Sequence, residues 1–92
     1  MKYAMIVFAR RDPGLLVDLA AEFKRHRIFP EQFRSETREV GEVEIRSVMD
    51  CDEASAQAVR RFCESALQVR KVVIIAVPPA TARISPLALY RL

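Results

Sequence analysis

The sequence predicts an α+β fold in which one antiparallel sheet of four strands carries two helices on a single face. Two observations support this prediction. Short runs of strand-forming residues alternate with two longer segments whose apolar residues recur every three or four positions, and the elements follow in the order β-α-β-β-α-β. Because crossover connections are right-handed, the first and third strands are expected side by side in the middle of the sheet.

The first strand and the first helix are expected over residues 2–9 and 13–27. The strand is almost continuously apolar and rich in strand-forming residues, which suits a central position in the sheet. Asp12 is placed to cap the helix, and Pro13 fits the first helical position. Basic residues crowd the last turn, where they suit the helix dipole.

The second and third strands are expected over residues 32–40 and 43–49. The second strand alternates loosely between apolar and polar residues, and the third alternates clearly. Gly41 between them predicts a tight hairpin, because glycine accepts turn conformations that other residues avoid. Glu42 and Glu44 are expected on a solvent-facing surface of the third strand.

The second helix is expected to start at an N-cap supplied by Asp50 or Asp52 and to run to about residue 69. Its inward-facing residues are expected to be Ala58, Val59, Phe62, Cys63, Ala66 and Leu67. The last strand, residues 72–77, is the clearest in the chain, and two prolines stop it. This order of elements is the ferredoxin-like arrangement, or split βαβ.

The chain is long enough for one small domain, expected over residues 1–77. Residues 78–92 form an apolar tail broken by prolines, which we expect to be either disordered or laid along a partner. A composition that is 51% apolar is hard to bury in so short a chain, which favours a homodimer. The net charge of +3 is scattered in pairs and suits solvated helix ends, so no nucleic-acid partner is expected.

Other functions that this fold carries in known proteins need residues that this sequence lacks. RNA-recognition domains stack bases on aromatic residues of the first and third strands, and the third strand here has none. Metal-carrying versions need a Cys-x-x-Cys pair in the first loop, but residues 10–14 contain neither Cys nor His. The single histidine, His26, sits among cations, and no nucleophile, base and orienting group form a set. We therefore expect no catalytic residues, no metal and no cofactor.

The two cysteines are too few and too far apart to form a disulfide framework or a metal site. Cys63 is expected in the core, whereas Cys51 precedes the second helix, whose dipole is expected to lower its pKa. No apolar run approaches the roughly twenty residues that cross a bilayer, and no secretion signal is recognisable. A cytoplasmic location without membrane contact is expected.

Residues 9–16, Ala-Arg-Arg-Asp-Pro-Gly-Leu-Leu, followed by Leu19 and Phe23, resemble the first-loop signature of ACT domains. In the order of elements the resemblance covers residues 2–77. It implies a β-α-β-β-α-β module that binds amino acids and regulates a metabolic enzyme. Within this family the chain is most similar to the small regulatory subunits of acetolactate synthase. Those subunits associate with a separate catalytic subunit that makes precursors of branched-chain amino acids.

The resemblance implies a ligand site in the first loop, formed by Arg11, Asp12, Gly14, Leu15 and Leu16. A small amino acid would place its carboxylate near the N–H groups of Gly14 and Leu15, and Arg11 would add a charge-assisted contact. The expected partners are a second copy of the chain, a catalytic enzyme subunit and a small amino-acid effector. The alternative is a stand-alone dimeric interaction domain that has lost ligand binding.

Overall fold

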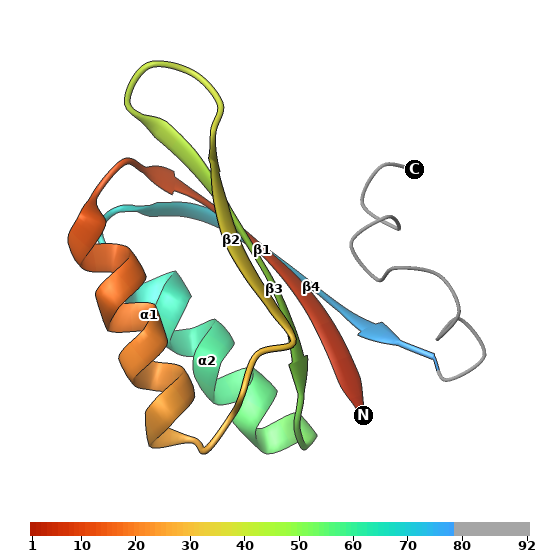
Figure 1. The fold of residues 1–92 in the computed structure, drawn as a ribbon. Helices are drawn as coiled ribbons and strands as arrows, with labels where there is room; N and C mark the ends of the chain where they lie inside the picture. Colours follow the sequence, from red (N-terminus) through yellow and green to blue (C-terminus); the bar gives the residue numbers. More distant parts are fainter. Residues whose placement is uncertain (79–92) are drawn as a thin grey trace.

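The computed structural model describes residues 1–78, so the expected tail lies outside the described residues apart from its first one. The elements follow one another in the expected order (Figure 1). They are β1 (Lys2–Arg10), α1 (Pro13–Arg25), β2 (Gln32–Thr37), β3 (Glu42–Asp50), α2 (Glu53–Ser65) and β4 (Val69–Val77). Neighbouring strands are antiparallel and lie in the order β2-β3-β1-β4, which confirms that β1 and β3 form the middle of the sheet.

Both helices cover the same face of the sheet, and the core lies between them and the central strands (Figure 1). On this face Met5 of β1 lies beside Ser47 of β3, and Val7 lies beside Ile45. The helices contribute the buried side chains of Leu15, Leu19, Phe23, Ala56, Val59 and Cys63. The predicted ferredoxin-like fold and the core position of Cys63 are thus confirmed.

The first helix ends slightly earlier than the apolar pattern suggested. It stops at Arg25 rather than at residue 27, because Arg27 adopts a φ of 56°, in the left-handed region. The Ile28 N–H then donates to the Phe23 carbonyl at 2.8 Å and closes a wider turn. This turn directs the chain back toward the sheet and into β2.

The second helix also ends early, and here the prediction that Leu67 faces inward was wrong, whereas Ala66 packs against the core as predicted. The helix stops at Ser65, because Ala66 has extended torsions (φ −76°, ψ 131°). The Leu67 side chain is 92% exposed instead of buried. The physical reason is strand pairing. Val69 already pairs with Ala9 of β1, so residues 66–68, which the apolar pattern assigned to the helix, form the turn that leads into β4.

The hairpin between β2 and β3 is wider than predicted. The second strand ends at Thr37, and a loop over residues 38–41 separates it from β3. The loop closes with the Glu42 N–H donating to the Glu39 carbonyl at 2.9 Å. Gly41 adopts a φ of 79°, which confirms the turn role predicted for this glycine.

Each helix has 13 residues, well short of the roughly twenty that a bilayer requires. Within residues 1–78, no helix combines the length and the apolar character needed to cross a membrane.

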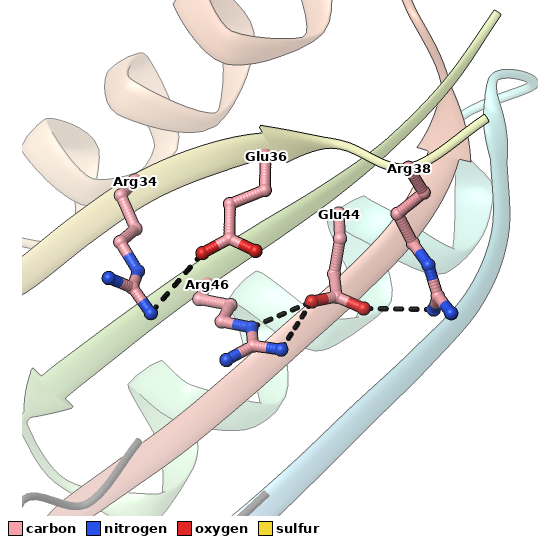
Figure 2. A network of polar contacts seen from close by, with 5 residues as sticks. All are labelled: Arg34, Glu36, Arg38, Glu44 and Arg46. Carbon is pink, nitrogen blue, oxygen red and sulfur yellow. Dashed lines mark hydrogen bonds and ion pairs between the residues drawn. The ribbon is translucent and has the colours of Figure 1, made fainter. Parts of the chain in front are cut away.

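A charged network formed by residues of β2, β3 and the loop between them lies on the sheet face that the helices leave open (Figure 2). The carboxylate of Glu44 accepts hydrogen bonds from Arg38 Nη1 at 2.9 Å and from Arg46 Nε at 2.7 Å. A second pair joins Arg34 to Glu36 at 3.3 Å. The side chain of Glu44 is only 7% exposed, so the expectation that it faces solvent was wrong. Two long guanidinium side chains cover the carboxylate, a contact that strand alternation does not reveal.

Candidate functional site

The turn between β1 and α1 is held by Asp12, which is the N-cap residue of α1 as predicted. Its extended backbone (φ −150°, ψ 112°) turns the carboxylate back over the first helical turn, where Oδ1 accepts from the Gly14 N–H at 2.9 Å. Oδ2 accepts from Gln68 Nε2 at 2.8 Å. The hydrogen bonds from Gln68 and then Gly14 hold the pKa of Asp12 below its usual range. Asp12 is therefore ionised at neutral pH.

A cavity of about 320 Å³ lies where this turn faces β2 and β3. Its lining residues are Arg11, Asp12, Pro13, Leu16, Ser35, Thr37, Val43 and Ile45. The volume is at the lower end of the range for small-molecule sites, so the cavity suits a ligand of metabolite size. The walls combine a cation, a carboxylate, two hydroxyl groups and an apolar surface.

Of the five ligand residues predicted from the sequence, the structure brings three to this cavity. Arg11, Asp12 and Leu16 line it. Gly14 lies at the surface in the first turn of α1, and the Leu15 side chain, 1% exposed, belongs to the core. The role of all five residues in ligand binding stays a prediction.

The two backbone N–H groups expected to bind a carboxylate already have acceptors within the turn. The Gly14 N–H donates to Asp12 Oδ1, and the Leu15 N–H donates to the Asp12 carbonyl at 3.0 Å. A Cβ at Gly14 would lie 3.2 Å from Asp12 Oδ1, tighter than most such contacts, so glycine leaves the cap undistorted. A ligand carboxylate would compete with Asp12 for these donors, which makes the Arg11 guanidinium the better anchor.

Reasoning from the sequence missed the wall that β2 contributes. Ser35 pairs with Ile45 across the strands, and Thr37 pairs with Val43, so all four face the helix side of the sheet. The hydroxyl groups of Ser35 and Thr37 both donate and accept hydrogen bonds. The alternation of side chains along β2 predicts that both hydroxyls lie on one face of the strand. No local feature of the sequence indicates that this face lies next to the first loop.

The guanidinium of Arg11 has no ion-pair partner within residues 1–78, unlike most arginines of this part of the chain. The paired arginines are Arg25, Arg34, Arg38, Arg46, Arg60 and Arg70. The Arg11 backbone is anchored, since its N–H donates to the Gly41 carbonyl at 2.8 Å. The cavity thus offers an uncommitted cation next to the ionised carboxylate of Asp12, an arrangement complementary to a zwitterion.

The other reactive side chains lie away from the cavity. Burial raises the pKa of Cys63 to about 12. Burial, and then the negative charge of Asp52, raises the pKa of Cys51, so the expectation that the helix dipole lowers it was wrong. His26 Nε2 lies 3.3 Å from a carboxylate oxygen of Glu22. In the part of the chain that the structure describes, no group of His, Cys, Asp and Glu side chains is arranged to hold a metal ion.

Comparisons with known proteins find similarity in fold rather than in sequence. No protein-family model matches the chain, and no curated protein matches it. The small subunit of acetolactate synthase from Thermotoga maritima is similar in structure, with a TM-score of 0.69 at 15% identity over 87% of this chain and 50% of that one. The ACT domain of GTP pyrophosphokinase from Chlorobium tepidum gives a TM-score of 0.67 at 5% identity, over 82% of this chain and 97% of that domain.

A formyltetrahydrofolate deformylase from Burkholderia mallei ATCC 23344 also matches, with a TM-score of 0.67 at 16% identity over 83% of this chain. The match spans only 28% of the deformylase, and the match above spans half of the acetolactate synthase small subunit. These likenesses show that the chain has the ferredoxin-like fold of ACT domains, the fold that the first-loop resemblance predicted.

Proposed function

We propose that this chain is a non-catalytic regulatory domain that senses a small amino acid, in the manner of a small regulatory subunit of acetolactate synthase. The fold it shares with that subunit and with the ACT domain of GTP pyrophosphokinase supports the proposal. The observation that carries it is the cavity of about 320 Å³ beside the first loop, which is lined by the Arg11 cation, the Asp12 carboxylate and an apolar wall.

The lining chemistry favours a zwitterion with an aliphatic side chain. The carboxylate of such a ligand pairs with the Arg11 guanidinium, and its ammonium group finds the Asp12 carboxylate and the Thr37 hydroxyl. The aliphatic side chain packs on the apolar wall formed by Leu16 and Ile45. Valine, leucine and isoleucine fit this description, which agrees with control of branched-chain amino acid synthesis.

The proposed assembly is a homodimer that contacts a catalytic enzyme subunit. The second strand is an edge strand with one paired neighbour, and all its residues except Gln32 are exposed. Such an edge invites pairing with another chain. Ser35 and Thr37 lie on the same strand, so a second copy at this edge would border the ligand cavity. Sedimentation at micromolar concentration should give twice the monomer mass, and a monomer there would contradict this assembly.

Calorimetric titration with valine, leucine and isoleucine tests ligand binding. We expect saturable binding in the millimolar range or tighter by at least one of them. We also expect little binding of valinamide, which lacks the carboxylate. Arg11→Gln should weaken binding by about tenfold or more, the value of a charge-assisted hydrogen bond. The control is Arg61→Gln, which removes an exposed arginine of α2 that lies outside the cavity.

Two results would reject the sensing function: no heat with any of the three amino acids, or equal effects of the Arg11 and Arg61 substitutions. Such a result would favour the alternative function, a stand-alone dimeric interaction domain. The Asp12 cap supports this alternative, because Asp12 already accepts the hydrogen bond of the Gly14 N–H that a ligand carboxylate would use. Affinity capture on the tagged chain separates the two, since a regulatory subunit should retain a biosynthetic enzyme as its main partner.

A further inference from the structure

Three connections of the chain meet at one end of the domain, opposite the N-terminus (Figure 1). They join β1 to α1, β2 to β3, and α2 to β4. Two consecutive N–H groups hold them together, because Arg10 donates to the Gln68 carbonyl at 2.9 Å and Arg11 donates to the Gly41 carbonyl at 2.8 Å. The three connections therefore form one continuous surface.

A hollow of about 310 Å³ lies in this surface and is lined by Arg10, Arg11, Asp12, Gly41 and Gln68. Both arginines are exposed, and within residues 1–78 neither guanidinium has an ion-pair partner, whereas Arg38 and Arg70 pair with Glu44 and Glu42. The two carboxylate oxygens of Asp12 already accept hydrogen bonds from Gly14 and Gln68. The hollow is therefore suited to bind carboxylates through its two arginines.

This hollow is distinct from the ligand cavity, although Arg11 and Asp12 line both. Arg10 lines the hollow and not the ligand cavity, so it reports on the hollow alone.

Two exposed aliphatic side chains lie next in sequence to residues that line the hollow. Val40 precedes Gly41 in the hairpin loop and is 103% exposed, and Leu67 precedes Gln68 in the turn before β4 and is 92% exposed. A single exposed aliphatic residue is ordinary on a protein surface. Here two of them come from different connections that main-chain hydrogen bonds fix beside the same two arginines, a combination that suits a protein partner.

We propose that this end of the domain is a docking surface for an acidic, leucine-rich segment of a partner protein. The carboxylates of the segment pair with the guanidinium groups of Arg10 and Arg11, and its aliphatic side chains pack on Val40 and Leu67. A small anion would use the charges but leave both aliphatic side chains in water. A nucleic acid would find no aromatic ring on which to stack among the residues that line the hollow. The proposal goes beyond amino-acid sensing, since docking needs neither the ligand nor its cavity.

Amide chemical shifts of the ¹⁵N-labelled full chain, recorded during titration with a defined peptide, test the proposal. The probe is the capped octapeptide Leu-Glu-Glu-Leu-Leu-Glu-Glu-Leu, and the comparison peptide has glutamine in place of each glutamate. We expect saturable shifts at Arg10, Gly41, Leu67 and Gln68 with the acidic peptide, and binding of the neutral peptide that is weaker by about tenfold or more. No saturable shift with the acidic peptide, or equal affinity for the two peptides, would overturn the proposal.

Further titrations test the other occupants of this surface. Equal shifts with inorganic phosphate or with single-stranded octathymidylate, at the same concentration of negative charge, would show a general anion site and overturn the proposal. Shifts of the same amides that grow with chain concentration in the absence of peptide would assign the surface to a second copy and also overturn it. We expect neither result.

Substitutions in the full chain provide an independent readout. Arg10→Gln and Leu67→Ser should each weaken binding of the acidic peptide by about fivefold or more. The matched controls are Arg61→Gln, at an exposed position of α2, and Phe29→Ser, at an 89% exposed position between α1 and β2. Effects of the first two substitutions no larger than those of the controls would refute the docking surface. Because Arg10 does not line the ligand cavity, Arg10→Gln should leave valine binding unchanged, so a failure of docking and a failure of amino-acid sensing give different results.

Discussion

Replacing Glu44 with glutamine tests whether the open-face network stabilises the fold. The Glu44 carboxylate is 7% exposed and accepts from Arg38 and Arg46, and the Arg46 side chain is itself only 14% exposed. Glutamine keeps the shape but removes the charge and has a single acceptor oxygen, so one of the two hydrogen bonds is lost, the other is weakened, and Arg46 loses its counter-charge. At about 1 kcal/mol for each affected bond, the variant should lose about 2 kcal/mol of unfolding free energy.

Urea denaturation of the wild type and variants gives the comparison. Glu36→Gln is the matched control, because the Arg34–Glu36 pair is about half exposed at both ends and such pairs contribute about 0.5 kcal/mol or less. Replacing both Glu44 and Arg46 with leucine should recover much of the loss, since no buried charge is then left unpaired. If Glu44→Gln costs no more than Glu36→Gln, the network is a surface feature and the reasoning fails.

Other residues give shorter tests. Ser47 is fully buried and its hydroxyl has no hydrogen-bond partner in the described part of the chain, so Ser47→Ala should stabilise the fold by about 1 kcal/mol in urea melts. A loss of stability would mean that a partner is present. Gln68→Leu should raise the pKa of Asp12, followed by NMR of its side-chain carboxyl carbon, because the main hydrogen bond that lowers this pKa disappears. The contribution of ionised Asp12 to the free energy of unfolding is complete above its unfolded pKa, near 3.8, and is lost as the pH falls through the lower folded pKa. In Gln68→Leu this loss of stability at acid pH should be smaller. An unchanged pKa of Asp12 would contradict the role given to Gln68. Cys63, with a pKa of about 12, should resist thiol reagents at pH 8 until the protein unfolds, and rapid labelling of the native protein would show that the site opens.

The parts of the fold that depend on local signals were predictable from the sequence. The Asp12 cap, the turn at Gly41 and the central position of β1 follow from residue type and spacing, and the structure contains all three. The end of α2 was not predictable in this way. Leu67 continues the apolar pattern of the helix. However, Val69 pairs with β1, so the chain leaves the helix before Leu67 and the Leu67 side chain is exposed.

In the candidate site, too, the residues close together in the sequence were predictable and those brought in by tertiary packing were not. Arg11, Asp12 and Leu16 follow one another closely in the sequence, so the turn into α1 pointed to them. Ser35 and Thr37 reach the cavity only through the packing of the β2 edge near that turn, which depends on tertiary structure. The burial of Glu44 has the same origin, because it depends on how neighbouring guanidinium groups lie across the sheet.

Amide chemical shifts of the ¹⁵N-labelled full chain, recorded during titration with valine, leucine and isoleucine, test the proposed sensing site most directly. The account predicts saturable shifts at Gly14, Leu15 and Leu16 in the first loop, together with Ser35 and Thr37 on the facing strand. Silence with all three amino acids, or shifts confined to residues away from the cavity, would contradict it.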